Sequence, residues 1–222
     1  MSRVFPRGDD DKVQSPSSTS PPPAESMIFP STFTVWKKSS MSFDCMDGFT
    51  VFDSRGRLAF RVDNYSRSCR WLTQDLVLMD GEGSPIMALR PKITSMHEQW
   101  DGFEGEGSPR KTGRGRRVFS IRKRHMANHK GQAVVNIGDD FSVPDFYIEG
   151  NYSKRCCKIR RVTGEVVAEI CRKQASTSDA VLLGTDVFSL TINPGFDSEL
   201  VMAFVVAMDR ISWKYFIPAL FH

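Results

Sequence analysis

The most asymmetric chemical feature of the sequence is the segment from Arg110 to Arg124, which is rich in Arg and Lys and contains no acidic residue. Guanidinium groups chelate phosphate oxygens, and the summed field of a cationic cluster attracts anions. On a folded scaffold, such a segment is suited to docking on anionic lipid, where each cation contributes about 1 kcal/mol near the surface. The candidate ligand-binding residues are Arg116, Arg117, Arg122, Lys123 and Arg124.

A strand is expected to begin at Val118, within this basic segment. Because alternate residues of a strand face opposite ways, Arg122 and Arg124 should share one face while Lys123 points to the other. Ser120 follows two arginines, as in a basic-directed phosphorylation site, but a position inside a strand would keep it from a kinase. Two other interpretations of the segment remain open: a solvated loop that follows Gly-Glu-Gly at 105–107, or a contact with nucleic-acid phosphate that has no sequence specificity.

Signatures of catalysis and of metal binding are missing from the sequence. No Gly-x-Ser-x-Gly motif, Walker loop or His-Glu-x-x-His motif occurs. His125 and His129 are four residues apart, but zinc needs three or four ligands and no further ligand lies at a suitable spacing. Gly138-Asp139-Asp140 predicts a turn rather than a pair of catalytic acids. We therefore expect no enzyme, cofactor or metal, although an enzyme whose groups converge from distant strands remains a weaker alternative.

The composition indicates a single globular domain in a reducing compartment. The chain has 222 residues, of which 40% are hydrophobic and 25% charged, with a net charge of +4. Its five cysteines are odd in number and form no Cys-x-x-Cys motif, and no secretory signal is evident at the start, so we expect free thiols and a cytoplasmic protein. The longest apolar run, Leu200 to Met208, is shorter than the roughly 20 residues that cross a bilayer, so no transmembrane span is expected.

Short apolar runs separated by turn residues predict a mostly β fold. Three stretches have the pattern of a strand, a turn that contains Gly, and a second strand, which is typical of hairpins: residues 49–62, 76–89 and 157–170. Short strands at intervals of about 8–12 residues are typical of a sandwich or a barrel.

The exception is the C-terminal run from Leu200 to Met208, which predicts a helix. Asp197 is a plausible N-cap and Glu199 lies in the first turn, where a negative charge is favourable. Every side of this helix is apolar, so it must be surrounded by protein. A long apolar helix after many strands suggests a closed barrel filled by that helix, which also removes exposed sheet edges.

Composition divides the chain into three parts. Residues 1–30 are rich in Ser and Pro and predict a disordered tail, residues 31–217 form the barrel domain, and residues 218–222 form a C-terminal tail. The domain is expected to be a monomer.

Several stretches resemble the plant LURP-one-related family, whose fold is similar to the Tubby C-terminal domain and to phospholipid scramblases. The most distinctive are FDSRGRLAFRVDNY, at 52–65, and VAEICRKQ, at 167–174. The other matching stretches occur in the family's order: FTVWK at 33–37, GFTV at 48–51, LMDG at 78–81, YIEG at 147–150, GEV at 164–166, LGTDV at 183–187, and residues 194–208.

The resemblance implies a barrel of about twelve antiparallel strands around a central hydrophobic C-terminal helix, and a plant source. Together with the acid-free basic segment and the missing catalytic motifs, the resemblance predicts a non-enzymatic Tubby-like binding module, in plant defence or signalling, for an anionic ligand such as a phosphoinositide head group. Tubby domains bind that ligand through basic surface residues, but those residues have no readable counterpart here, so the ligand is carried over by fold alone. A protein-interaction or regulatory module without lipid binding is the alternative. Such a module would lie in the cytoplasm, peripherally at the plasma membrane, or in the nucleus.

Overall fold

The computed structural model describes seven stretches of the chain: residues 29–38, 48–64, 75–92, 98–104, 115–124, 131–174 and 184–213. Most of the expected N-terminal tail and all of the expected C-terminal tail lie outside these stretches, so the domain boundaries stay predictions. Several basic and histidine side chains of the sequence analysis also lie outside them: Arg110, Lys111, Arg114, His125 and His129.

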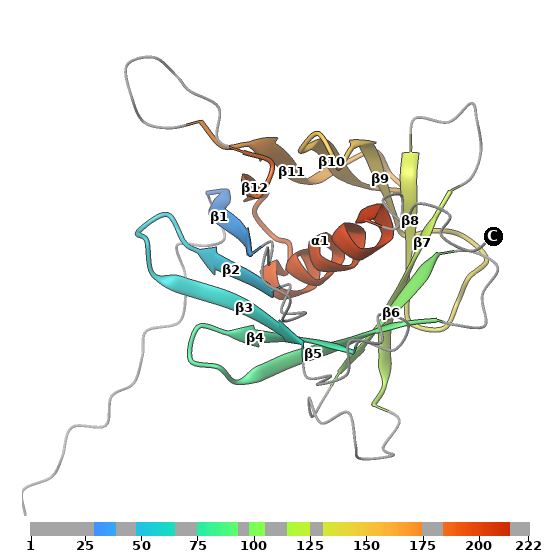
Figure 1. Cartoon of the computed structure of the whole chain (residues 1–222). Coiled ribbons are helices and arrows are strands. Elements are labelled where there is room, and N and C mark those ends of the chain that lie inside the picture. Colours follow the sequence, from blue (N-terminus) through green and yellow to red (C-terminus); the bar gives the residue numbers. More distant parts are fainter. Residues whose placement is uncertain are drawn as a thin grey trace, which may run out of the picture.

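Within the described residues, the chain forms twelve strands and one helix (Figure 1). The strands are β1 (Ser31–Lys38), β2 (Gly48–Phe52), β3 (Leu58–Asn64), β4 (Leu76–Asp80), β5 (Pro85–Pro91), β6 (Gln99–Glu104), β7 (Arg117–Lys123), β8 (Gly131–Ile137), β9 (Phe146–Asn151), β10 (Cys156–Arg161), β11 (Val166–Arg172) and β12 (Val187–Ile192). The helix is α1 (Ser198–Trp213).

Each strand pairs with its neighbours in the sequence, and β1 pairs with β12, so the antiparallel sheet closes into a barrel. The three predicted hairpins are confirmed as β2–β3, β4–β5 and β10–β11. Their turns contain Gly56, Gly83 and Gly164, whose φ angles of 78°, 92° and 89° are those that favour glycine. Closure leaves no strand edge unpaired, which agrees with the expected architecture.

Helix α1 fills the barrel, as the apolar run predicted (Figure 1). Asp197 Oδ1 accepts hydrogen bonds from the amides of Glu199 at 2.8 Å and Leu200 at 3.4 Å, which confirms Asp197 as the N-cap. From Val201 to Met208, every side chain is at most 2% exposed. The helix is therefore enclosed on all sides by the inner face of the sheet.

Gly102 on β6 makes room for the core aromatic Phe119 of the neighbouring strand. A Cβ atom on Gly102 would lie 2.2 Å from Phe119 Cε1, and the ring is itself packed edge-on against Phe204 of α1, with centroids 4.8 Å apart. We expect Gly102→Ala to lower the free energy of unfolding by about 1–3 kcal/mol, because the ring must leave its packed position. Urea denaturation measures this loss. Gly184→Ala is the matched control, since nothing lies within 4 Å of its added Cβ; equal losses in the two variants would contradict the explanation.

Candidate anion-binding face

Strand β7 and the residues directly before and after it carry the five candidate cations, which form two groups. Arg116 and Arg117 lie where the strand begins, while Arg122, Lys123 and Arg124 lie where it ends. Arg122 lies five positions after Arg117, which is roughly 16 Å at the usual rise per residue. The segment is therefore not one cluster in space, and each group has its own neighbours.

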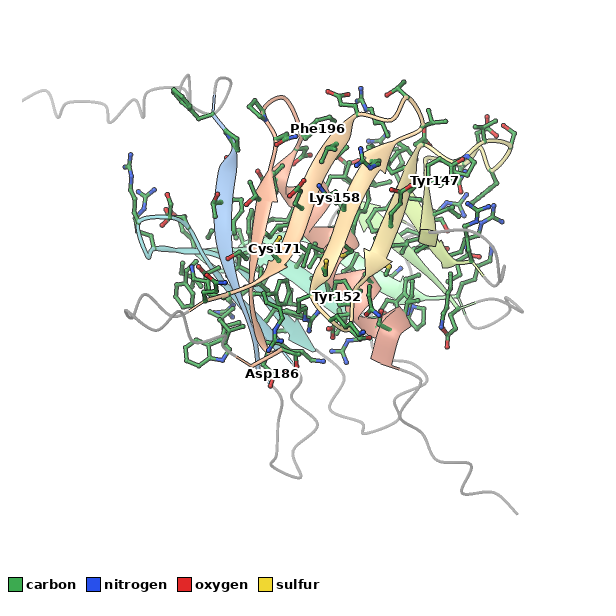
Figure 2. The ribbon with its side chains drawn as sticks, turned by 90° about the horizontal axis from the view of Figure 1, so that it is seen from above. Tyr147, Tyr152, Lys158, Cys171, Asp186 and Phe196 are labelled. Carbon is green, nitrogen blue, oxygen red and sulfur yellow. The ribbon has the colours of Figure 1, made fainter. Side chains whose placement is uncertain are left out.

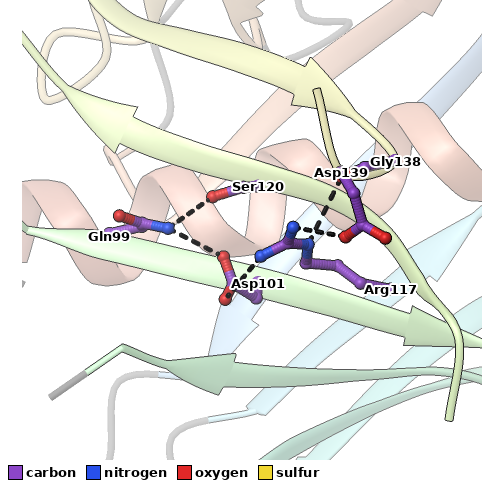
Figure 3. A network of polar contacts seen from close by, with 6 residues as sticks. All are labelled: Gln99, Asp101, Arg117, Ser120, Gly138 and Asp139. Carbon is purple, nitrogen blue, oxygen red and sulfur yellow. Dashed lines mark hydrogen bonds and ion pairs between the residues drawn. The ribbon is translucent and has the colours of Figure 1, made fainter. Parts of the chain in front are cut away.

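The first group is neutralised by acids from other strands and turns. Arg116 Nη2 lies 2.8 Å from Glu104 Oε2. Arg117 forms an ion pair with Asp139, donates a hydrogen bond to the Gly138 carbonyl at 3.3 Å and lies 3.9 Å from Asp101 (Figure 3). These partners leave little net charge at this end of β7.

Phe141 and the turn around it also hold Arg117. The Arg117 guanidinium lies 4.6 Å from the Phe141 ring centroid. Gly138 begins the predicted turn, with φ of 67°. In the same turn, a hydrogen bond from the Ser142 amide holds the pKa of Asp140 below its usual value. Asp140 is thus charged at neutral pH and adds a further acid to the turn that carries Asp139.

Next to Arg117, the outer face of β6 and β7 carries polar side chains that are buried and hydrogen-bonded to one another. Gln99 Nε2 donates to Ser120 Oγ at 2.7 Å and to Asp101 Oδ1 at 3.1 Å (Figure 3). Ser120 is 2% exposed and lies inside the strand, as expected, which closes it to a kinase in the folded protein.

The second group presents two arginines on the outer face of the barrel. Phe146 packs against Phe204 of the central helix, so Tyr147, the next residue of β9, points outward. Arg124 places its guanidinium 5.8 Å from the Tyr147 ring centroid, a cation–π contact. Arg122 and Tyr147 lie in one row across the sheet, because both residues are register partners of Val134 on β8, which lies between them. Among the described residues, neither Arg122 nor Arg124 forms an ion pair with a carboxylate.

One further arginine extends this surface. Arg160 on β10 is the register partner of Tyr147, and its Nε lies 3.2 Å from Glu149 Oε2. We call Arg122, Arg124, Tyr147 and Arg160 the β7–β10 face. Figure 2 shows Tyr147 and Lys158 on this side of the barrel. The face thus carries three guanidinium groups and one aromatic ring, and Glu149 pairs with one of the guanidinium groups, that of Arg160.

Lys123 is placed apart from this face. Every second residue of β7 faces the inside of the barrel, and Phe119 and Ile121 are buried there. Lys123 is the next residue in this series. Its Nζ lies 3.2 Å from Glu98 Oε2, and its side chain is 14% exposed. The expected division, with Arg122 and Arg124 on one face and Lys123 on the other, agrees with these surroundings.

A second charged cluster, which the sequence did not predict, lies at the C-terminal end of α1. Asp209 is 5% exposed and forms ion pairs with two cations, Lys37 Nζ at 3.0 Å and Arg155 Nη2 at 3.3 Å. The Arg155 guanidinium also lies between the rings of Tyr152 and Phe188, 4.5 and 4.2 Å from their centroids. The ion pairs fasten the helix to β1 and to the turn before β10, so their role is structural.

The described residues show no arrangement that would hold a metal, since no three His, Cys, Asp or Glu side chains converge among them. No helix in the described part of the chain is both long and apolar enough to pass through a membrane.

Comparison with known proteins gives the chain its family. The LURP-one-related family model matches residues 31–209. LURP-one-related 5 of Arabidopsis thaliana is 36% identical over 79% of this chain and 80% of its own length. LURP-one-related 12 of the same plant is 38% identical over 75% of this chain and 72% of its own. An X-ray structure of an Arabidopsis thaliana protein superposes with a TM-score of 0.56 at 21% identity, covering 85% of this chain and 95% of that one, and so shares the fold. The chain therefore belongs to the LURP-one-related family, as its distinctive stretches implied.

Proposed function

We propose that this protein is a non-enzymatic binding module whose β7–β10 face recognises an anionic ligand, such as a phosphoinositide head group. The observation that carries the proposal is the pair Arg122 and Arg124, which share the outer face without a carboxylate partner among the described residues. A phosphate group would accept hydrogen bonds from both guanidinium groups, which are the donors best suited to its oxygens.

The fold supports recognition on the outside of the barrel. Helix α1 fills the interior with side chains at most 2% exposed between Val201 and Met208. Arg122 lies in strand β7 and Arg124 directly follows it, and side chains on a regular element are held in position more precisely than those on loops. The stacking of Arg124 on Tyr147 adds to this order, because the ring limits the directions in which the guanidinium points.

Co-sedimentation with vesicles tests the proposal. The full chain is mixed at physiological salt with phosphatidylcholine vesicles that do or do not contain phosphatidylinositol 4-phosphate. We expect Arg122→Gln with Arg124→Gln to weaken binding about 30-fold, since two cations near an anionic surface contribute about 2 kcal/mol together. Competition by soluble inositol phosphate separates recognition of the head group from general attraction to a charged surface.

Arg55→Gln with Arg61→Gln is the matched control, because it removes the same charge from the β2–β3 side. The control should bind like the parent. The proposal fails if the control loses as much binding as Arg122→Gln with Arg124→Gln. It also fails if only Arg116→Gln with Arg117→Gln loses binding, because the ligand would then lie at the other end of β7.

A further inference from the structure

Two cysteines lie directly opposite each other on neighbouring strands. Cys156 begins β10, and its register partner on β11 is Cys171. Both are free thiols and both are exposed, whereas Cys157 points inward and is 4% exposed. Figure 2 shows Cys171 on β11. Residues in such a pair project from the same face of the sheet, so the two thiols are neighbours on the outer surface.

The backbone separation of an opposed antiparallel pair suits a disulfide. Opposed residues have Cα atoms about 4.5 or 5.5 Å apart, depending on the hydrogen-bonding pattern. Disulfides join residues whose Cα atoms are about 4.4–6.8 Å apart, so either spacing is compatible with a bond. The bond therefore needs only a rotation of the two side chains.

The charged surroundings of the thiols set the rate of such a reaction. Partial burial raises the pKa of Cys171, the Glu169 carboxylate and Cys156 raise it further, and Lys158 lowers it. Lys158 and Glu169 form an ion pair with each other. The register partners on the outer strands, Asn151 of β9 and Ser189 of β12, carry no charge. Cys171 therefore stays mainly in the thiol form at neutral pH, and a rise in pH supplies its reactive thiolate.

We propose that Cys156 and Cys171 are a modification site at which a peroxide forms a reversible disulfide across the β10–β11 hairpin. One thiolate attacks the peroxide, the O–O bond breaks, and a sulfenic acid and hydroxide are formed. The second thiolate then attacks the sulfenic acid sulfur and displaces a second hydroxide. Each hydroxide takes up the proton that one of the thiols released on ionising, so two waters are formed. The two sulfurs lose two electrons in total and the peroxide gains them. A dithiol reductant reverses the bond.

The disulfide fastens the open end of the hairpin beside the turn that carries Arg155. Arg155 directly precedes Cys156 and has a left-handed φ of 52°. Its side chain holds the Asp209 ion pair at the end of the central helix. Oxidation is therefore expected to rigidify the part of the sheet to which the helix is fastened.

Peptide mapping by mass spectrometry tests the site. The full chain is treated with hydrogen peroxide at low concentration, its remaining thiols are alkylated, and it is digested without reduction. We expect a cross-linked peptide pair that contains Cys171 and the 156–157 segment, and that dithiothreitol separates. The rate should rise with pH between pH 7 and 8, because the thiolate is the nucleophile.

Adjacent variants identify the sulfur that reacts. Cys157→Ser should keep the cross-link, whereas Cys156→Ser and Cys171→Ser should each abolish it. The proposal is overturned if Cys157→Ser removes the cross-link and Cys156→Ser keeps it. It is equally overturned if Cys156 and Cys171 are oxidised to sulfonic acids, pair with Cys45 or Cys69, or link two chains instead.

Discussion

Phe204→Ala lowers the free energy of unfolding by about 3–5 kcal/mol, the usual loss for removing a fully buried aromatic side chain. Phe204 is in the middle of α1 and is 0% exposed. Its ring packs against Phe119 at 4.8 Å and Phe146 at 5.5 Å, so truncation removes contacts with two strands at once. The closed sheet cannot collapse far into the space, because its strands are joined all the way round. Urea denaturation followed by circular dichroism measures the loss.

Phe29→Ala is the matched control, because it removes the same atoms from a residue that is 69% exposed. It should change the free energy of unfolding by less than about 0.5 kcal/mol. If Phe204→Ala is as stable as Phe29→Ala, the helix is not the centre of the core and the architecture is wrong.

Asp209→Ala has the second large expected effect, a loss of about 3–5 kcal/mol in the free energy of unfolding. The substitution removes the carboxylate that pairs with both Lys37 and Arg155. The Arg155 side chain is 5% exposed, so water cannot replace the lost partner. Its Nη1 atom has no hydrogen-bond partner among the residues that the structure describes, which makes the loss of the Nη2 partner more serious. Thermal and urea unfolding of the variant measure this.

A surface pair provides the comparison for Asp209. Asp63 lies 2.9 Å from Arg61, and both side chains are nearly half exposed. Asp63→Ala should lower the free energy of unfolding by no more than about 1 kcal/mol, since water screens exposed pairs. Similar losses in Asp63→Ala and Asp209→Ala would show that burial of the Asp209 ion pairs does not increase their contribution to the free energy of unfolding.

Strands with an apolar pattern and a glycine turn could be predicted from the sequence, and so could the helix. The run from Leu200 to Met208 has no polar face, and only enclosure explains that. Strand β6 lacked such a pattern. Gln99 donates hydrogen bonds to Asp101 and to Ser120 on a buried outer face, which favours polar residues there, and Gly102 is small because Phe119 occupies the space that a side chain would need. Tertiary contacts, rather than local preference, fix these residues.

The candidate cations could also be identified from the sequence, but their electrostatic surroundings could not. The basic segment contains no acid, yet Arg116 and Arg117 meet Glu104 and Asp139 from neighbouring elements. Nor could the sequence show that Arg122 and Tyr147 would lie in one row across the sheet, on either side of Val134, because that row follows from the register of β7, β8 and β9. Alternation along one strand predicts which of its own residues share a face, but only the pairing of strands determines which residues of the neighbouring strands lie on that face.

The most direct test of the β7–β10 face is hydrogen–deuterium exchange of the full chain with and without vesicles that contain phosphatidylinositol 4-phosphate. Occupation of the face should slow exchange in the peptides that cover the end of β7 and the beginning of β9, around Arg122–Arg124 and Tyr147. Vesicles of phosphatidylcholine alone should leave those peptides unchanged. Unchanged exchange there, or slowing confined to the hairpin of β2 and β3, would contradict the account.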